Sequence, residues 1–324
     1  SGYLKELLVV MREATEGKSF DAILEDEYWG IKNDLGRRLY MTVCCFHQHG
    51  SYVRDELLSK LLGISLPEIY RQTADWTEGV VIFEPLGRID GAYAARARHR
   101  IIAAIVWERC SEGTDQNKLV HDALDALNLT YRMDRIVFDQ FVCSDRLVDG
   151  IKSLEDRVRF FETACRKDPD NPYVRQHYSR MLLRAGQEEL ALGQINEAIA
   201  MRPDYRVLHH TKGMVLSHLA KTVSSREIAR RRMAQSEESF RKALEMNSRD
   251  DYSYQGLAGL YFQWAQRADT PEQEAAEFLA KAEEIIDQGL KISRNRESLW
   301  IESSKIQGFL GNEPSRLAAL EKAV

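Results

Sequence analysis

The sequence predicts a mainly α-helical protein, in which a small unit with one β-hairpin precedes an α-solenoid of paired helices. Two observations carry this prediction. Small and apolar residues recur at fixed distances through the second half of the chain, which is typical of stacked helical repeats. In addition, the 324 residues include only 7 prolines and 19 glycines, too few for an all-β fold interrupted by many turns.

The recurring pattern is clearest between residues 161 and 203, where an apolar residue is followed by a small residue and then by proline. The two copies are 34 residues apart: Phe161, Ala164 and Pro169, then Ile195, Ala198 and Pro203. A period of 34 with two helices per step is the tetratricopeptide spacing. The small side chains allow neighbouring helices to approach closely, and the proline ends the second helix of each pair.

Later copies of the pattern are more widely spaced. Ala198 is followed by Ala243 and then by Gly289, at steps of 45 and 46, before a final step of 34 reaches Ala323. The surplus residues, 224–235 and 269–280, are rich in helix formers, so we expect them to lengthen the helices of two hairpins. We therefore assign residues 151–324 to the repeat array.

Composition restricts the class of protein. The formal charge of -5 and the pI near 6.0 argue against binding nucleic acid through bulk charge. The sequence contains neither an apolar run long enough to span a membrane nor a signal peptide, so we expect a cytoplasmic protein without a membrane partner. Five cysteines without a CxxC pair indicate reduced thiols rather than a metal site. Because the chain begins Ser-Gly and ends within a helical pattern, we expect a piece of a longer protein.

The first third of the chain divides into residues 1–29, a helical segment, and residues 30–110, a compact unit. In the second of these ranges the periodicity predicts three helices followed by two strands: helices at 33–48, 53–62 and 67–76, and strands at 80–83 and 92–95. Three helices and a β-hairpin in this order are typical of a winged helix, which in DNA-binding proteins places its third helix in the major groove.

The third predicted helix has the wrong charge for binding DNA. Its sequence, PEIYRQTADW, sets Glu68 and Asp75 against the single cation Arg71, whereas phosphate contacts supply most nonspecific affinity. A protein-packing role is therefore favoured. The alternative is a transcription factor that reads DNA through this helix under the control of the repeat array.

A basic cluster follows the predicted hairpin, in the sequence RARHRIIAAIVW at residues 96–107. Arg98, His99 and Arg100 fall at the start of a helix, where free backbone N–H groups and the helix dipole favour an anion. A histidine at this place can donate a hydrogen bond to a phosphate. The alternative interpretation is a basic helix start that contacts only solvent.

The order of elements over residues 3–107 resembles the region that follows the nucleotide-binding core in STAND-class signal-transduction ATPases, which include many bacterial defence proteins. In that family a histidine after the winged helix contacts the β-phosphate of bound ADP and holds the off state. His99 matches that histidine by position, whereas Arg98 and Arg100 replace the family's usual Met and Asp. The resemblance implies an ATPase core as a partner, with ADP or ATP as its cofactor.

The sequence itself lacks the phosphate-binding loop GxxxxGK[ST] and an acidic strand for magnesium. We therefore expect no enzymatic activity, no cofactor and no metal in this chain alone. Residues 111–150 are expected to be a helical connector, with helices at 117–127 and 135–148, that transmits ligand-induced strain from the array to the winged helix and releases His99 from ADP.

The partner of the array is expected to be a protein that binds its concave face, which first-helix residues line in tetratricopeptide arrays. One recurring position holds Arg175, His209, Tyr254 and Trp300, and Tyr178 and Lys212 lie three residues after the first two of these. Core packing is the alternative role for the aromatic members. A basic run, Arg226, Arg230, Arg231 and Arg232, is either an anion contact or a solvated helix face.

Overall fold

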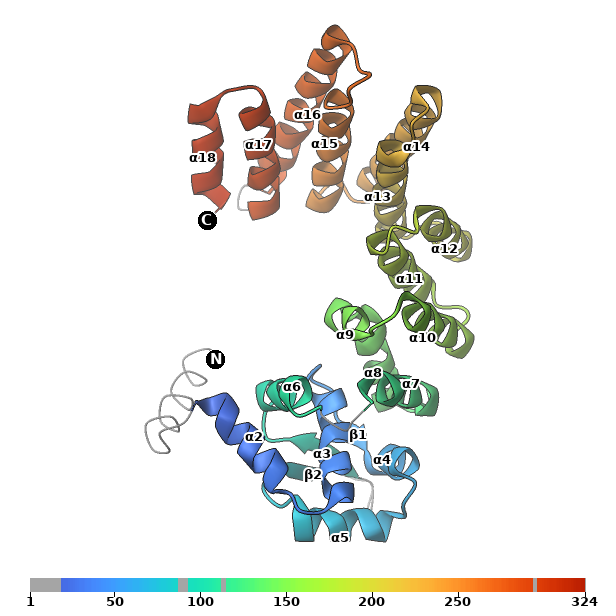
Figure 1. Ribbon diagram of the computed structural model, residues 1–324. Helices are drawn as coiled ribbons and strands as arrows, with labels where there is room; N and C mark the ends of the chain where they lie inside the picture. The colour runs from blue at the N-terminus through green and yellow to red at the C-terminus, as the bar shows by residue number, and fades with distance from the viewer. Residues whose placement is uncertain (1–18, 87–92, 112–114, 294–295, 324) are drawn as a thin grey trace. The chain divides into compact units, whose positions relative to one another are not determined.

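The computed structural model describes residues 19–86, 93–111, 115–293 and 296–323 (Figure 1). The chain forms two compact units, residues 1–167 and 168–324. It is mainly helical, as the sequence predicts. The helical stripe expected within residues 3–18 lies outside the described residues.

The first unit begins with helices that surround a small sheet. The helices are α2 (Phe20–Gly30), α3 (Asp34–His47), α4 (Asp55–Leu62), α5 (Leu66–Trp76) and α6 (Arg100–Arg109), and the strands are β1 (Val53–Arg54), β2 (Val81–Pro85) and β3 (Tyr93–Ala97). The strands pair in the order β1-β3-β2, and both pairings are antiparallel. This confirms the predicted helices and the predicted hairpin.

The prediction that the second helix begins at Val53 is wrong, because Val53 and Arg54 form strand β1 and the helix begins at Asp55. Val53 is buried and pairs with Ala95 of β3, and Arg54 has an extended backbone that delays the helix until Asp55. A single pair of extended residues is too short to produce a period of two in the sequence.

Helix α3 is the centre of the first unit. It contacts α4, α5, α6 and β3, and its residues from Leu39 to His47 are all buried. A helix that is buried on every side is surrounded by other elements. Gly36 allows α5 to approach, since an added Cβ would lie 3.0 Å from Trp76 Cβ.

Four further helices complete the unit: α7 (Gln116–Ala126), α8 (Arg132–Cys143), α9 (Asp145–Gly150) and α10 (Leu154–Lys167). The prediction of one helix over 135–148 is wrong, because Ser144 ends α8 and its Oγ accepts a hydrogen bond from Leu147 N at the start of α9. Helix α10 packs on α7, where Lys167 Nζ donates to the carbonyl oxygens of Asp125 and Leu127, each at 2.9 Å.

A buried ion pair joins α8 to the small sheet. Arg54 Nε donates to Asp134 Oδ1 at 2.7 Å, and Arg54 Nη2 donates to Asp134 Oδ2 at 3.0 Å. Asp134 is 1% exposed, and it also accepts from the backbone N of Asn128 at 2.8 Å. The two hydrogen bonds from Arg54 and the third from Asn128 N offset the free-energy cost of removing the carboxylate from water.

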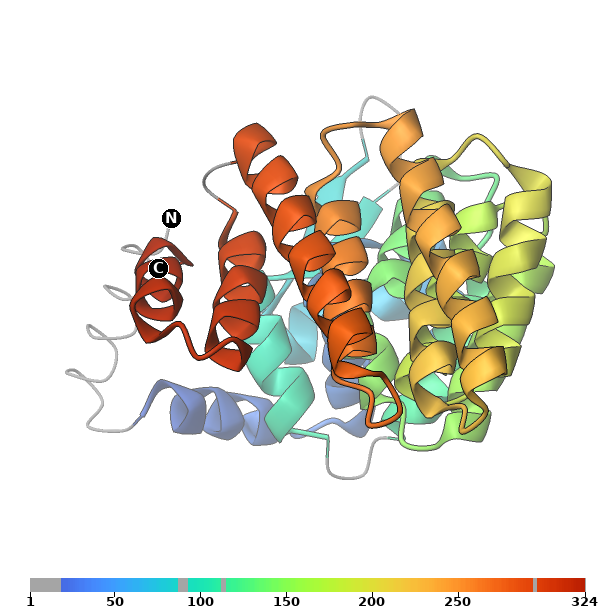
Figure 2. The same ribbon diagram turned by 90° about the horizontal axis from the view of Figure 1, so that it is seen from above.

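The second unit consists of four helical hairpins that follow one another in chain order (Figures 1 and 2). They are α11 (Pro172–Arg184) with α12 (Glu188–Met201), α13 (Arg206–Thr222) with α14 (Arg226–Met246), α15 (Asp251–Ala265) with α16 (Glu272–Ile292), and α17 (Glu297–Phe309) with α18 (Glu313–Ala323). Each first helix contacts its own partner and the next first helix. Helices α14 and α16 have 21 residues and α12 has 14, which confirms that the surplus segments lengthen two hairpins.

Small residues lie where these helices approach most closely. A Cβ added to Gly289 would lie 3.0 Å from Tyr254 Cβ. Phe240 is fully buried between glycines of two consecutive first helices, and a Cβ added to Gly213 or Gly256 would lie within 2.8 Å of its ring. The small-residue pattern in the sequence therefore marks helix contacts, as expected.

Candidate functional site

His99 is the N-cap of α6 and lies on the surface. Its backbone is extended, and its Nδ1 accepts a hydrogen bond from Ile101 N at 3.3 Å. A ring nitrogen that accepts a hydrogen bond carries no proton, so the neutral ring has its proton on Nε2. The cap therefore fixes the tautomer and leaves one N–H donor available.

The two neighbouring arginines have different surroundings. Arg98 forms an ion pair with Glu27 of α2, and both side chains are about three-quarters buried. Arg100 is exposed and makes no ion pair with any described residue. The basic cluster identified in the sequence thus separates: Arg98 binds α2 and is mostly buried, whereas His99 and Arg100 are exposed.

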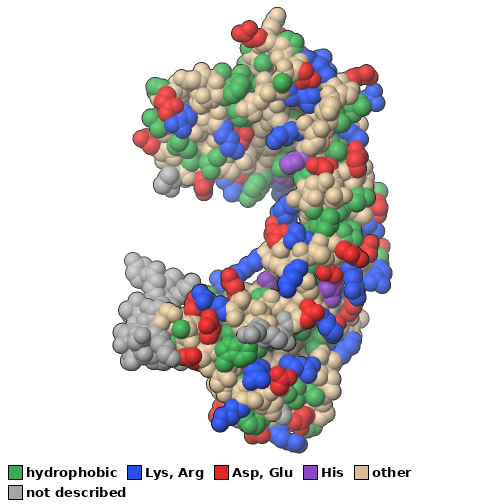
Figure 3. Space-filling view, viewed as in Figure 1, with side chains coloured by type: hydrophobic (Ala, Val, Ile, Leu, Met, Phe, Trp, Pro, Cys, Tyr) green, Lys and Arg blue, Asp and Glu red, His purple; other side chains and the backbone are tan. Residues whose placement is uncertain are grey.

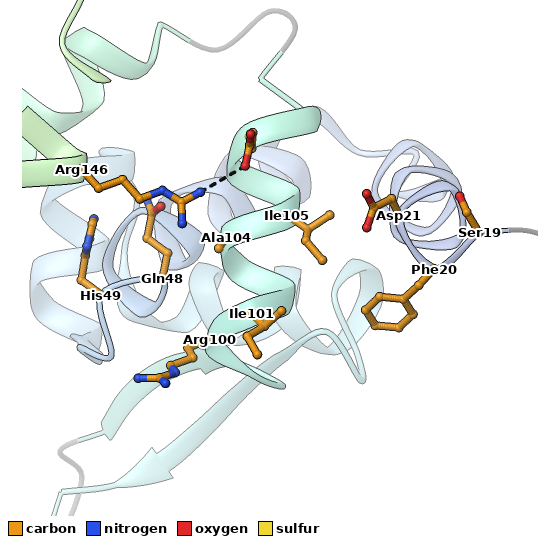
Figure 4. Close-up of a pocket in the computed structure, with 11 residues that line it drawn as sticks. Ser19, Phe20, Asp21, Gln48, His49, Arg100, Ile101, Ala104, Ile105 and Arg146 are labelled. Atoms are coloured by element: carbon orange, nitrogen blue, oxygen red, sulfur yellow. Dashed lines mark hydrogen bonds and ion pairs between the residues drawn. The ribbon is translucent and has the colours of Figure 1, made fainter. Parts of the chain in front are cut away.

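Arg100 lines a cavity of about 580 Å³ along the exposed face of α6 (Figure 4). Ile101 and Ile105 form an apolar strip along α6, and Phe20 of α2 lies beside it. On the opposite side of α6 are Gln48 and His49, from the end of α3 and the following turn, and Arg146 of α9. The volume lies in the range of small-molecule sites.

Two cavities share an ion pair in their lining. Arg146 Nη2 lies 3.1 Å from Glu108 Oε2, and both residues, with Gln48 and His49, also line a cavity of about 280 Å³. His49 Nε2 is buried and has no hydrogen-bond partner among the described residues. Burial, with a smaller contribution from Arg146, lowers the pKa of His49 to about 4, so its ring is neutral at pH 7.

The lining of the larger cavity is partly apolar and partly charged. The larger cavity offers an apolar strip, the cation Arg100 and a neutral imidazole, which suit a ligand with an apolar body and an anionic group. Its other charged side chains are already paired, Arg146 with Glu108 and Asp21 with Arg109. In the described ranges, no group of three or more His, Cys, Asp or Glu side chains is arranged to hold a metal ion.

Residues at the recurring array position mostly contact the second helix of their own hairpin. Arg175 Nη1 pairs with Glu197 Oε2 of α12 at 2.5 Å, Tyr254 packs on Gly289 of α16, and Lys322 Nζ of α18 lies 4.5 Å from the centre of the Trp300 ring. The other three predicted residues also have limited access to a ligand. His209 Nε2 donates a hydrogen bond to Pro203 O at 2.8 Å, Tyr178 is 8% exposed, and Lys212 is half-buried. Their assignment to a ligand stays a prediction.

The sequence reasoning missed a row of polar contacts between consecutive first helices. Gln176 Nε2 donates to Thr211 Oγ1 at 3.0 Å, His210 Nδ1 lies 3.1 Å from Ser253 Oγ, and Ser217 Oγ donates to Gln263 Oε1 at 3.1 Å. Gln176 and His210 each lie one residue after the recurring position, so a one-residue shift of the register would have found them.

The basic run of α14 is neutralised within the chain. Every member lies near a carboxylate: Arg226 pairs with Glu274, Arg230 lies 4.0 Å from the same carboxylate, Arg231 lies 3.4 Å from Glu227, and Arg232 lies 3.1 Å from Glu189. The pairs with Glu274 and Glu189 join α14 to α16 and α12, whereas the pair with Glu227 lies within α14. The run therefore offers little uncompensated charge to an external anion.

The surface of α5 gives no support to DNA reading. Arg71 Nη1 pairs with Glu68 Oε2 at 2.9 Å, and Asp75 is exposed. On the face of each unit seen in Figure 3, basic and acidic side chains are interspersed. Such a surface lacks the concentrated positive charge that phosphate backbones attract.

No protein-family model matches the sequence, and no curated protein matches it. Solved structures with a similar fold include the TPR protein TTC0263 of Thermus thermophilus, at 18% identity over 52% of this chain and 80% of that chain, with a TM-score of 0.45. PilF of Pseudomonas aeruginosa matches at 13% identity over 67% and 86%, and MamA of Desulfovibrio magneticus RS-1 at 12% over 64% and 93%, both with a TM-score of 0.41.

Within the described residues, no helix combines the length and the apolar character needed to cross a membrane.

Proposed function

We propose that this chain is the sensor and regulatory portion of a STAND-like ATPase. In this proposal the hairpins of the second unit are a tetratricopeptide array that recognises a protein ligand, and the first unit is a winged helix that restrains a nucleotide-binding core. The 34-residue spacing and the stacked hairpins support the array. The strand order β1-β3-β2, with three helices before the hairpin, supports the winged helix.

A surface for protein recognition is available on the array. Consecutive first helices lie in contact, so their outward faces form one continuous surface. Stacked helical repeats use extended surfaces of this kind to bind proteins. The row of contacts that includes Gln176, Thr211, His210 and Ser253 fixes the spacing of these helices.

The observation that carries the regulatory proposal is the Nε2 donor of the exposed His99 beside Arg100, which has no ion-pair partner among the described residues. In the proposed off state, His99 donates a hydrogen bond to the β-phosphate of ADP held by the ATPase core, and Arg100 supplies positive charge. Hydrogen bonds to phosphate are charge-assisted and so comparatively strong. The same donor is released when the first unit moves away from the core.

The Arg54–Asp134 pair provides a path for transmission. It joins the small sheet of the first unit to α8, which belongs to the connector, and Lys167 joins α10 to the end of α7. A displacement of the connector therefore acts directly on the sheet that precedes α6. Because a buried ion pair is costly to break, the two parts are expected to move together.

Nucleotide titration tests this proposal. We expect isothermal titration to detect no tight ADP binding by this chain alone, because it lacks a phosphate-binding loop. In a longer chain that carries the core, His99→Asn should lower ADP retention about tenfold, as expected for the loss of one charge-assisted hydrogen bond. Asparagine can still cap α6, so the variant separates phosphate contact from helix stability.

Either of two results would overturn the regulatory role. Tight ADP binding by this chain alone would place the whole nucleotide site within it. Unchanged ADP retention in the His99→Asn variant would show that the imidazole does not contact the nucleotide. His99→Ala, which removes both the donor and the cap, serves as the control for loss of the helix start.

A further inference from the structure

A groove of about 300 Å³ lies between α12, α13 and α14 in the second unit. Leu192 and Ile199 of α12 and Leu216 of α13 supply its apolar lining, and Lys212 and Lys242 supply positive charge. The groove lies between the first helix α13 and two second helices, so His209 and Lys212 line it in addition to holding first-helix positions. Its volume suits a few side chains rather than a folded domain.

The charge in this groove is not balanced from within. Neither Lys212 nor Lys242 forms an ion pair with a carboxylate in the described part of the chain. The guanidinium of Arg232, which also lines the groove, is already paired with Glu189. Glu238 is the one acidic residue in the lining that the structure describes.

The positive charges of Lys212 and Lys242 both act on His209, which lines the same groove. Burial lowers the pKa of His209, and Lys242 and Lys212 lower it further. Its Nε2 is occupied by Pro203 O. The imidazole therefore stays neutral, and the two ammonium groups are the charges that an incoming ligand meets.

We propose that this groove binds an acidic peptide segment, with a carboxylate between Lys212 and Lys242 and a neighbouring aliphatic side chain on the partly exposed Leu192 and Ile199. The inference rests on the proposed protein-binding role of the array and names the chemistry of its partner. A carboxylate forms charge-assisted hydrogen bonds to the lysines, and the aliphatic side chain covers the apolar lining. Inorganic phosphate would satisfy the lysines but leave that lining exposed.

Fluorescence anisotropy on the whole chain tests the proposal. The probe is a fluorescein-labelled peptide with two glutamate–leucine pairs between glycine and serine residues, and the matched peptide has glutamine in place of glutamate. We expect the glutamate peptide to bind with a Kd below about 1 mM and the glutamine peptide to bind about tenfold more weakly, because the charge-assisted bonds are lost.

Charge reversal in the groove locates the binding. Lys212→Glu and Lys242→Glu should each weaken the glutamate peptide about tenfold or more, because a like charge then replaces an attractive one. Lys221→Glu is the matched control, since Lys221 is exposed on α13, the helix that carries Lys212, and does not line the groove. It should leave binding unchanged.

Three results would overturn this inference: no binding of the glutamate peptide, equal binding of both peptides, or equal weakening by Lys221→Glu. Full competition by inorganic phosphate or by single-stranded RNA at equal concentration would also overturn it, because the groove would then be a general anion site. The ADP experiment does not involve these lysines. A negative result with the peptides would therefore not count against the regulatory role of His99, which the ADP experiment tests separately.

Discussion

At the scale of single residues, the first unit contains histidines that burial keeps neutral. The pKa values of His47 and His49 are both lowered to about 4, chiefly by burial, with Arg96 and His99 adding to the effect on His47 and Arg146 adding to the effect on His49. Protonating either ring places a charge in a poorly solvated site beside existing cations. Stability of this unit is therefore linked to pH.

We predict that the first unit loses stability as the pH falls from about 6.5 to about 4. In this window the unfolded chain, with histidine pKa values near 6.5, binds more protons than the folded chain, so the free energy of unfolding decreases. At about 1.4 kcal/mol per pKa unit, the two rings together contribute several kcal/mol. Urea denaturation between pH 7 and pH 4 measures the slope, and a His47→Gln/His49→Gln variant should flatten it. An unchanged slope in that variant would exclude these rings as the cause.

A second prediction at the residue scale concerns the stability contributed by the Arg54–Asp134 pair. Asp134→Asn leaves the buried guanidinium of Arg54 with the exposed Glu56 as its remaining counter-charge, so we expect a loss of about 3 kcal/mol in the free energy of unfolding, the low end of the range for a broken buried pair. Arg71→Gln breaks an exposed ion pair and should cost about 1 kcal/mol or less. Thermal and urea denaturation compare the two variants. Equal effects would mean that the buried pair has no special role.

At the scale of helices, Phe240 packs against bare backbone of both α13 and α15. We predict that Gly256→Ala destabilises the array by about 1 to 3 kcal/mol, because the added Cβ would lie 2.5 Å from Phe240 Cε1. Gly193→Ala in α12 is the control, since an added Cβ there meets no atom within 4 Å. Alanine favours helix over glycine by up to about 1 kcal/mol, so the control should be neutral or stabilising. The opposite order of the two variants in urea denaturation would contradict this packing.

Helices and strands were predictable from the sequence where a regular spacing of apolar or small residues extended over enough residues to be recognised. The lengthened helices α14 and α16 followed from the extra residues between Ala198, Ala243 and Gly289. The break at Ser144 was not predictable from periodicity, because apolar residues continue across it and only its hydroxyl marks the new helix start. Strand β1 was too short to recognise.

The side-chain contacts of the candidate site were less predictable than the elements, because many of them join residues that are distant in the sequence. The position of His99 at a helix start followed from the sequence order. The pairing of Arg98 with Glu27, and of Arg226 with Glu274, joins residues 71 and 48 positions apart. No local pattern reveals such pairs, and they decide which cations remain available to a ligand.

At the scale of the whole molecule, stability should vary along the array. Helix α15 buries most of its length, including Tyr261 and Leu257, whereas in α18 the described residues include a single buried side chain, Ala319. We predict that amides of α18 exchange with deuterium faster than those of α15, because local opening of α18 exposes little apolar surface. Hydrogen exchange followed by mass spectrometry measures this difference, and equal protection of the two helices would contradict it.

The two hydrophobic clusters of the second unit also bear on how such a chain evolves. One cluster runs from α13 to α17 through Phe240 and its neighbours, whereas Ile195, Ala198 and Leu208 form a separate, smaller cluster between α12 and α13. The helices at the boundary between the two clusters nevertheless contact each other more extensively than α16 and α17 do. Duplication or loss of a hairpin by recombination therefore disturbs the fewest helix contacts between Ile292 and Glu297, and lineages that change the number of hairpins should do so there.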